Sequence, residues 1–311
     1  MEFAKRLIAQ ILSALFTLFA IALLTFSLMK LVPGGPFDGD KRLPPEILAA
    51  QNAKYGFDKA WYEQFGIYFR DLVLHFDLRE STKYIGRSVN EIIAESLPVS
   101  LELGFYALVI ATVFGIILGV LAAAKRGTWL DFTAMFVAIS GVSIPSFLMA
   151  ALAILVFSQY LNILPAALWD GPEHRILPSI VLGLRPAAII ARLTRSSILE
   201  VLYLDFTRTA KAKGLHPLKV LFVHVLRNAL VPVVTVMGPL AAAVLTGSFV
   251  IEYVFSVPGL ANHFIQAVTN RDYNLVMGVT LLYATFLIVM NLFVDVVYGW
   301  VDPRMKSGSG Q

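Results

Sequence analysis

The residue types that most often carry out chemistry are sparse in this chain and do not form the motifs that use them. The sequence contains no G-x-x-x-x-G-K-[ST] phosphate loop, no G-x-S-x-G nucleophile elbow and no H-E-x-x-H zinc motif. There is no cysteine, and the five histidines lack the spacing of metal ligands: His75, His174, His216, His224 and His263. The sequence therefore predicts neither a catalytic site nor a metal or other cofactor bound by this chain.

Ionisable residues are also rare inside the long apolar segments. Glu102, Glu252 and Asp295 stand at the ends of such segments, whereas Arg185 lies inside one. An arginine at membrane depth is a functional hypothesis by default. The alternative is that Arg185 faces the interior of a helix bundle or extends towards the cytoplasmic interface, and the sequence leaves both interpretations open.

The overall composition explains why polar groups are so few. Of the 311 residues, 58% are hydrophobic and 15% are charged, whereas soluble domains carry about 25% charged residues. A soluble fold, a disordered chain and a disulfide-stapled scaffold are therefore excluded. A helix needs about 20 apolar residues to cross a bilayer, and five segments meet this length: 7–29, 103–124, 132–157, 228–251 and 273–294.

The first of these segments follows Lys5 and Arg6, as the apolar core of a signal peptide does. It is longer than the usual signal core of about 15 residues, and no small-residue cleavage site follows it. We therefore expect it to be a membrane helix.

A sixth segment, 176–191, is interrupted by Arg185 and Pro186 and is close to break-even for insertion on its own. If it crosses, the loop 192–228, which carries seven Lys/Arg and two acidic residues, lies on the same side as the N-terminus. The positive-inside rule favours that arrangement. We predict an all-α membrane protein with six transmembrane helices and both termini in the cytoplasm.

This topology divides the chain into four parts. Residues 1–32 are the N-terminus and first helix, 33–99 an external segment, 100–306 the remaining core, and 307–311 a Ser/Gly tail of the kind that expression vectors add. The external segment has eight Lys/Arg and ten Asp/Glu, and its aromatic pattern predicts short amphipathic helices. The net charge of +4 thus combines an acidic external part with a basic cytoplasmic loop, and nucleic acid is not expected as a partner.

The cytoplasmic loop predicts a short helix with its own end signals. Asp205 is a suitable N-cap for a helix over 206–213, Gly214 suits a left-handed residue after its end, and the pair 216–217 (His-Pro) favours a second helix start. A helix this short is marginal alone, so we expect it to dock on something. The simpler interpretation is a basic anchor on lipid head groups, and the other is a lever that enters a groove on another protein.

At this loop the sequence resembles a known family. The stretches 206–214 and 224–229, followed by Pro232, are similar to the cytoplasmic loop of ABC-importer inner-membrane permeases, in particular those of the peptide/nickel branch. Of the superfamily pattern E-A-A-x-x-x-G, Ala210 and Gly214 match, whereas Arg208 replaces the glutamate and Thr209 the first alanine. Of the downstream pattern I-x-L-P, residue 226 (Leu) matches, while 224 (His) and 227 (Arg) depart from it in the manner of the branch.

The resemblance extends along nearly the whole chain and is greatest to the first membrane subunit of oligopeptide permeases. Single pieces are weak, but their order is specific. They are Pro33–Phe37, Leu43–Glu46, Ala53–Gly56, Val89–Asn90, Leu97–Ser100, Ile144–Phe147, Gly247–Glu252, Phe255, Pro258–Leu260, Asn270–Tyr273, Asp295 and Asp302–Pro303.

The resemblance implies a permease fold of the type I ABC importer kind in a bacterial inner (plasma) membrane, without a motor of its own. In that family a second homologous permease subunit completes the pathway, two cytoplasmic ATPase subunits bind ATP and magnesium, and an external binding protein delivers the peptide. The implied coupling element comprises Asp205, Phe206, Arg208, Thr209, Ala210, Lys211, Lys213, Gly214 and Leu215, with Arg208, Lys211 and Lys213 as contacts to the ATPase. The implied pathway or gate residues are Pro145, Arg185, Pro186, Glu252, Pro258 and Gly259. Pro145 and Pro186 are expected to break their helices where these line the cavity.

Three alternatives remain at this stage. The first is that the cargo of such a permease is a dipeptide, a nickel complex or an oligosaccharide instead of an oligopeptide. A self-sufficient secondary transporter is less well supported, because repeat symmetry and paired intramembrane carboxylates are not evident. An intramembrane enzyme lacks facing polar groups that would form its catalytic site.

Overall fold

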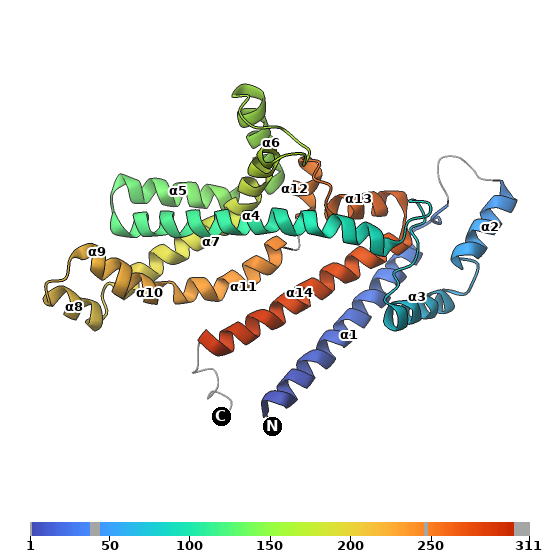
Figure 1. Cartoon of the computed structure of the whole chain (residues 1–311), viewed down its shortest axis with the longest axis horizontal. Coiled ribbons are helices and arrows are strands. Elements are labelled where there is room, and N and C mark those ends of the chain that lie inside the picture. The colour runs from blue at the N-terminus through green and yellow to red at the C-terminus, as the bar shows by residue number, and fades with distance from the viewer. Residues whose placement is uncertain (1, 38–43, 246–247, 302–311) are drawn as a thin grey trace. The chain divides into compact units, whose positions relative to one another are not determined.

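The computed structural model describes residues 2–37, 44–245 and 248–301, with side chains from 8 to 293. The described chain is helical apart from its loops and an isolated antiparallel bridge between Glu80 and Ser88 (Figure 1). It divides into two compact units, each built from segments distant in the sequence. Several predicted features lie outside the described residues, namely Leu43, Gly247, Asp302, Pro303 and the tail 307–311.

The first unit comprises residues 1–100 and 258–289. Its core is a cluster of buried apolar residues from the start of one long helix and from two later helices, including Val89, Ile92, Leu260, Leu275 and Val279. Its elements are α1 (Glu2–Leu31), α2 (Pro45–Tyr55), α3 (Trp61–His75), the beginning of α4 (Val89–Ala124), α13 (Leu260–Asn270) and most of α14 (Tyr273–Val301). The short helices predicted between the first two membrane segments are α2 and α3.

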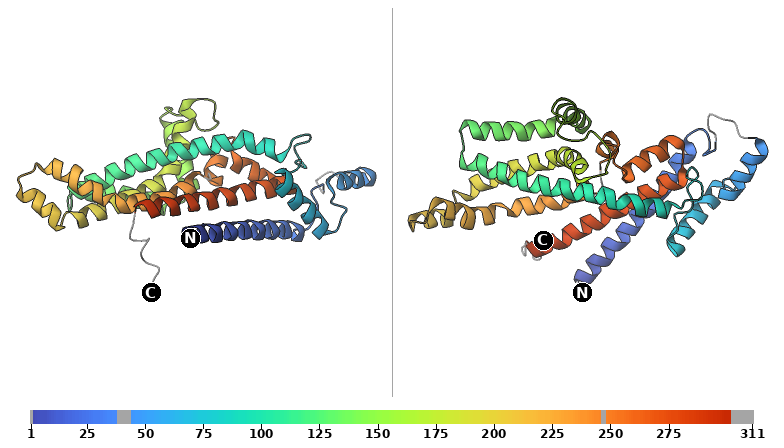
Figure 2. Two further views of the ribbon diagram at one scale, coloured as in Figure 1. Left: turned by 60° about the horizontal axis from the view of Figure 1, so that its bottom comes forward. Right: turned by 45° about the horizontal axis from the view of Figure 1, so that its top comes forward.

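The second unit runs from Leu101 to Val257 and resumes at Met290. Figure 2 shows α8 and α9 gathered at the end of α7, and α5 packs along α7. Besides the rest of α4, its elements are α5 (Trp129–Ser143), α6 (Ser146–Ala153), the π-helical η1 (Ile154–Tyr160), α7 (Pro172–Val201), α8 (Asp205–Ala212), α9 (Pro217–Lys219), the π-helical η2 (Val220–Val225), α10 (Leu226–Ala229), α11 (Val231–Leu245) and α12 (Phe249–Val254).

Among the described residues, five helical segments are long and apolar enough to cross a membrane. They are Ile8–Leu31, Val89–Ala124, Pro172–Val201, Val231–Val254 and Tyr273–Phe293. A sixth is reached if Trp129–Ser143 and Ser146–Tyr160, which are bent by 112° at their junction, form one span. The predicted segments are therefore found, but the third is a broken pair instead of one helix.

The break falls at Pro145, as the sequence predicts. Ile144 has φ −84° and ψ 128°, and Pro145 has φ −56° and ψ 139°, so both are extended. The proline ring clashes with a helical conformation of the preceding residue, and the proline has no N–H to donate. The two helices on either side therefore take different directions.

The prediction of a second break, at Pro186, is wrong. Helix α7 is continuous from Pro172 to Val201, with Pro178 and Pro186 both buried inside it. Helix α7 packs closely on α4: a Cβ on Gly183 would lie 2.7 Å from the Ala107 carbonyl oxygen, and one on Gly119 would lie 2.6 Å from the Ala191 oxygen. Prolines are tolerated inside membrane helices where neighbouring helices pack closely around them.

Candidate functional site

The short helix of the predicted cytoplasmic loop is α8, and its start differs by one residue from the expectation. Leu204 is the N-cap, with extended φ −72° and ψ 149°, and its side chain makes no cap hydrogen bond. Asp205 is instead the first helical residue, where its carboxylate stabilises the helix by interacting with the N-terminal dipole. The predicted N-cap role of Asp205 is therefore wrong, because the helix begins one residue earlier.

The end of α8 agrees with the sequence signals. Gly214 has φ +75°, and its N–H donates to the Lys211 carbonyl oxygen at 3.0 Å. Lys211 lies in the last turn and Lys213 is the C-cap, so both cations lie at the negative end of the helix dipole. His216 caps the following helix α9 by accepting the Leu218 N–H at its Nδ1, 3.4 Å away.

One face of α8 is fixed to the rest of its own unit. Thr207 is fully buried, and its hydroxyl donates to the Val201 carbonyl oxygen at the end of α7, at 2.9 Å. Ala210, one turn later, is also buried and packs into an apolar cluster. The other buried members of this cluster are Ala123, Ile198, Val201, Val220, Val225 and Ala229. Helix α8 is therefore bonded to the end of α7 and packs on η2, in a cluster to which α4 and α10 also contribute.

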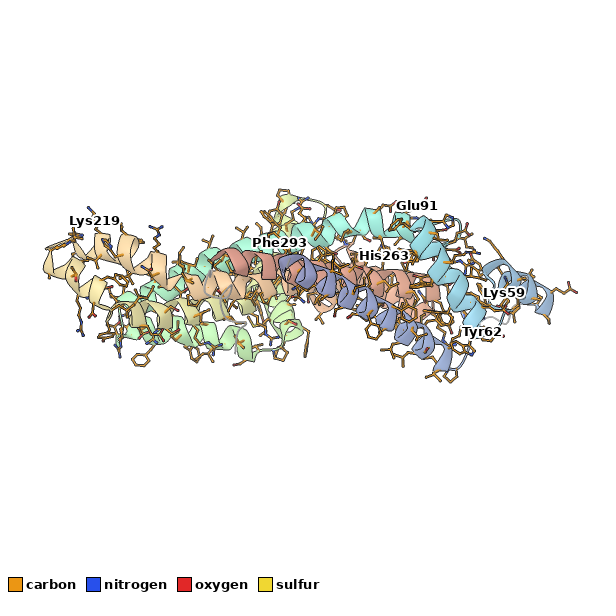
Figure 3. The ribbon with its side chains drawn as sticks, turned by 90° about the horizontal axis from the view of Figure 1, so that it is seen from below. Lys59, Tyr62, Glu91, Lys219, His263 and Phe293 are labelled. Carbon is orange, nitrogen blue, oxygen red and sulfur yellow. The ribbon has the colours of Figure 1, made fainter. Side chains whose placement is uncertain are left out.

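The rest of the α8 surface is not covered by the part of the chain that the structure describes. Leu215 is half-buried against the same cluster. The exposed residues are Asp205, Phe206, Arg208, Thr209, Lys211, Lys213 and Gly214. Lys219, at the end of α9, adds a further cation to this group of short helices (Figure 3). By their helical spacing, Phe206 and Lys211 flank the buried Thr207 and Ala210 on two sides, whereas Arg208 lies farther round the helix.

An ion pair that sequence reasoning missed fixes α5 to α7 near this site. Arg195 Nε and Nη2 donate to the two carboxylate oxygens of Asp131 at 2.6 and 2.8 Å, and the Asp131 side chain is 5% exposed. The Gly127 N–H donates to the same carboxylate at 3.0 Å. Arg195 belongs to α7, so residues 192–201 of the predicted loop are in fact the end of that helix. The sequence signal that could have revealed this ion pair is Asp131 itself, an acidic residue at the edge of an apolar segment.

The predicted pathway residues are spread over several elements of the second unit. Arg185 is exposed on α7 and has no hydrogen-bond or ion-pair partner within the described part of the chain, whereas Pro186 is buried beside it. Pro145 is the break between α5 and α6. Glu252, on α12, is fully buried, and its N–H donates to the Ser248 carbonyl oxygen at 2.9 Å. Helices α6, α7 and α12, at or on which these residues stand, pack on one another within the unit.

The last two predicted gate residues precede α13 in the first unit. Pro258 is exposed, whereas Gly259 is buried and is the N-cap of α13, with φ −96° and ψ −177°. The N–H of Leu260 donates to the buried hydroxyl of Ser100 at 2.9 Å. The segment after Pro258 is thus held to the beginning of α4, and its role as an external gate stays a prediction.

The comparison with known families decides the class of protein. Residues 115–307 match the family of binding-protein-dependent transport system inner membrane components. The chain belongs to this family. It is therefore a multi-pass inner-membrane permease, and the resemblance seen in its sequence is confirmed.

Individual relatives of the permease cover almost its whole length. It is 46% identical over 290 residues to the dipeptide transport system permease protein DppB of Bacillus subtilis, covering 93% of this chain and 94% of the relative. It is 41% identical over 304 residues to the oligopeptide transport system permease protein OppB of Salmonella typhimurium, covering 97% and 99%. Both relatives are named as membrane permeases.

Solved structures support the fold of the permease. The methionine ABC transporter MetNI in an inward-facing conformation matches with a TM-score of 0.58 and 17% identity, over 68% of this chain and 97% of that chain. An amino acid ABC transporter with histidines matches with a TM-score of 0.53 and 13% identity, over 67% and 93%. At these identities the match shows that the permease has the ABC importer fold.

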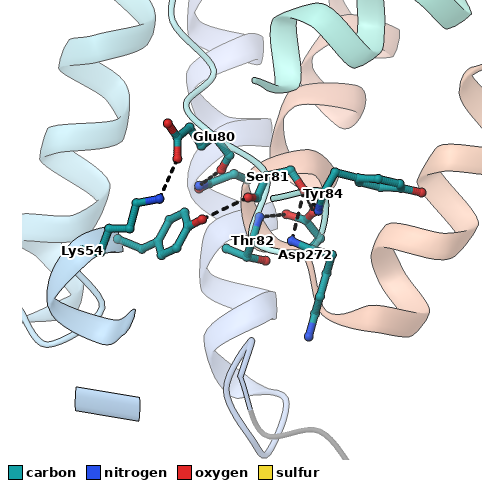
Figure 4. A network of polar contacts seen from close by, with 9 residues as sticks. Lys54, Glu80, Ser81, Thr82, Tyr84 and Asp272 are labelled. Carbon is teal, nitrogen blue, oxygen red and sulfur yellow. Dashed lines mark hydrogen bonds and ion pairs between the residues drawn. The ribbon is translucent and has the colours of Figure 1, made fainter. Parts of the chain in front are cut away.

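The permease also holds a buried polar network that sequence reasoning did not assign (Figure 4). Asp272 is fully buried before α14 and accepts hydrogen bonds from the Ser81 hydroxyl, from the Thr82 N–H at 3.2 Å and from the Leu275 N–H at 3.3 Å. Asn274 donates to the Glu80 carbonyl oxygen at 2.7 Å. The loop before α4 is thereby fixed to the start of α14.

A histidine in the same unit has a shifted pKa. Burial lowers the pKa of His263, the positive charge of Arg87 lowers it further, and Glu95 opposes the shift. The His263 ring lies 5.7 Å from that of Tyr84, edge to face. Tyr84 in turn donates its hydroxyl to Gln266 at 2.7 Å. His263 is therefore a neutral packing residue at neutral pH.

Proposed function

We propose that this permease forms half of a membrane pathway for peptides and that α8 is the element through which ATP-hydrolysing subunits act on it. The observation that carries the proposal is the two-faced environment of α8. Thr207 and Ala210 fix one side of α8 to the permease, while the side chains of Arg208, Lys211 and Lys213 are exposed. A helix held in this way transmits a displacement as a rigid body instead of bending.

The route of such a displacement follows from the packing of the second unit. Movement of α8 pulls on the Val201 carbonyl at the end of α7 through Thr207. Helix α7 is continuous, so the displacement reaches Arg185 and, through Arg195, the Asp131 end of α5. The coupling element thus acts on the helices that carry the pathway residues.

The choice of peptides as cargo rests on the relatives. Two relatives that match over almost the whole chain are named for dipeptide and oligopeptide transport, at 46% and 41% identity. Their names support peptides over nickel complexes or oligosaccharides. In this proposal a second permease subunit completes the pathway, two cytoplasmic ATPases bind ATP and magnesium, an external binding protein delivers the peptide, and both termini lie in the cytoplasm.

One face of α7 is suited to line the pathway. Arg185, Arg192 and Ser196 are all exposed and follow at spacings of seven and four residues, which places them on the same side of the helix. A charged side chain within a membrane span faces a protein interior or a water-filled cavity instead of lipid. We therefore assign this face of α7 to the translocation pathway.

Reconstitution of the complete complex tests the function. The chain, its co-purifying permease and ATPase subunits and the binding protein are placed in vesicles, and uptake of labelled di- and oligopeptides is measured. Uptake that needs ATP and the binding protein is the expected result. Uptake driven by a proton gradient without ATP would instead identify a secondary transporter and overturn the proposal.

Substitution of Thr207 tests the attachment of α8. Thr207→Val keeps the shape of the side chain but removes its hydrogen bond to Val201, which is worth about 1 kcal/mol. We expect ATP hydrolysis to continue while peptide uptake per ATP falls. Thr269→Val is the matched control, because the Thr269 hydroxyl makes an exposed bond to its own helix, α13, at 2.9 Å.

Substitution of Arg185 tests the pathway face. Arg185→Leu removes the charge without breaking any contact in the described chain, so we expect normal assembly and reduced uptake, with Arg185→Lys restoring part of it. Measurement of uptake and of thermal unfolding separates a role of Arg185 in the pathway from a role in the stability of the fold. Full uptake by the leucine variant, together with better membrane insertion, would show that Arg185 is only structural.

A further inference from the structure

Helix α3 packs against the middle of α1, not against its outer end. The Phe19 ring of α1 lies 5.9 Å from the Phe65 ring and 5.3 Å from the Phe69 ring of α3, both edge to face. Phe65 also meets Phe26, at 5.4 Å. Tyr68 of α3 is buried in a cluster with Ala22, Phe26, Met277 and Leu281.

These contacts fix how deep α3 lies. The apolar span of α1 is Ile8–Leu31, so Phe19 is close to its centre. At 1.5 Å per residue, Phe19 is about 18 Å from Leu31 along the helix, and the hydrocarbon layer is about 30 Å thick. A helix beside Phe19 therefore reaches into the hydrocarbon layer and does not lie outside the membrane.

Lys30 marks the level at which the membrane ends. Its ammonium group lies over the rings of Phe26, Phe57 and Tyr273, at 5.6, 5.2 and 5.4 Å. A lysine at the end of a spanning helix extends towards the polar interface. Phe57 is thus at the interface, and α3, which begins at Trp61, enters the membrane from there.

The exposed surface of α3 has one side of aromatic and aliphatic residues and another that carries charged residues beside the exposed Leu74. Tyr62, Phe69 and Val73 share one side by their spacing of seven and four residues; Tyr62 is 61% and Val73 52% exposed. Tyr62 stands at the beginning of the helix (Figure 3). Glu63 and Arg70 share another side, where Arg70 pairs with Asp71 at 2.8 Å.

We propose that α3 is embedded in the outer leaflet, with the side formed by Tyr62, Phe69 and Val73 in contact with lipid acyl chains. Its occupant is lipid because this side is continuous with the exposed surface of α1, which Phe69 joins at Phe19. The side with Glu63 and Arg70 faces head groups and water, where charges are inexpensive. Residues 61–76 are therefore a second membrane anchor, and the segment between α1 and α4 is not wholly external.

Spin-label accessibility in the assembled complex tests this proposal. The chain has no cysteine, so Val73→Cys, Tyr62→Cys and Glu63→Cys each give a single labelling site. Phe16→Cys, on the exposed side of α1, is the lipid reference. Each labelled complex is placed in phospholipid vesicles, and relaxation by oxygen and by a water-soluble nickel chelate is compared.

We expect the ratio of oxygen to nickel accessibility at positions 73 and 62 to exceed that at 63 several-fold, and the ratio at 73, which is farther along α3 from the interface than 62, to be the closer of the two to that at 16. Nickel accessibility at position 73 as high as at 63 would place α3 in water and overturn the proposal. Protection of positions 73 and 62 from both reagents would also overturn it, because a protein partner and not lipid would then cover this side. Use of two positions keeps the result decisive if one variant fails to assemble.

Discussion

The turn that ends α8 depends on a single residue without a side chain. Gly214 has φ +75°, and a Cβ there would meet nothing within 4 Å, so a substitution acts only through backbone strain. A β-branched residue in this conformation costs about 1–2 kcal/mol. We predict that Gly214→Val shifts the end of α8 and uncouples ATP hydrolysis from uptake, measured as peptide transported per ATP hydrolysed.

Two variants control for this effect. Gly214→Asn should retain coupling, because asparagine tolerates the left-handed conformation. Gly86 has the same φ of +75° and equally open surroundings, but it lies in the other unit. Gly86→Val therefore imposes a similar strain in the unit that does not contain α8, and a similar loss of coupling in this variant would contradict a specific role for the turn after α8.

Sequence signals predict the structure of single residues correctly where the outcome depends on neighbours along the chain. The left-handed Gly214 and the helix start at Pro217 follow from the chemistry of single residues and their neighbours. The N-cap was misplaced by one residue because Leu204, which has no capping side chain, takes that position. Asp131 was not assigned because its partner Arg195 is 64 residues away, and sequence spacing carries no information about such pairs.

At the level of elements, the junction of α5 with α7 depends on the pair formed by Asp131 and Arg195. The pair is bidentate and the carboxylate is largely buried. Removal of one partner leaves the other with unmet hydrogen bonds, at a cost of about 2 kcal/mol. We predict that Asp131→Ala and Arg195→Ala each lower the thermal stability of the purified permease.

A double-mutant cycle separates the interaction energy of Asp131 with Arg195 from the effect of removing each side chain alone. If the pair acts directly, the double variant is less destabilised than the sum of the single variants, with a coupling energy of about 1–3 kcal/mol. Lys54→Ala is the comparison, because its ion pair with Glu80 at 3.0 Å is exposed and remote in sequence from Asp131 and Arg195. Additive effects at 131 and 195 would show that the pair contributes nothing beyond its separate packing.

The two predicted helix breaks show what sequence can and cannot determine about elements. Both are X-Pro steps in apolar segments, yet Pro145 breaks its helix and Pro186 does not. The difference lies in tertiary packing: α7 is buried against several helices, with glycine contacts to α4, whereas residues around Pro145 are largely exposed. Local helix propensity also favours continuation at Pro186, which Ala187 and Ala188 follow, over Pro145, which Ile144 and Ser146 flank. The helices that pack on α7 come from distant parts of the chain.

At the scale of the whole molecule, apolar length and charge asymmetry predicted the helical class and the apolar segments. The division into two units was not predictable, because each unit combines segments from both halves of the sequence. The Asp272 network illustrates this: its partners Ser81 and Thr82 lie about 190 residues away. Hydrophobic periodicity reports which residues are buried and not which helix covers them.

The two units should respond differently to acid, because the shifted histidine lies in only one of them. The folded first unit lowers the pKa of His263 from its ordinary value of 6.5, so the unfolded state binds the proton more readily. The contribution of neutral His263 is fully present above pH 6.5 and is lost as the pH falls towards the folded-state value. We predict that between pH 7.5 and 5.5 amides in α13 and in the loop before α4 lose hydrogen-exchange protection, corrected for intrinsic rates, while those around α8 do not. His263→Gln should remove this difference in protection between the two units. His75→Gln, at an exposed position of the first unit, should keep the difference. An equal loss of protection in both units would show that acid acts on the whole chain.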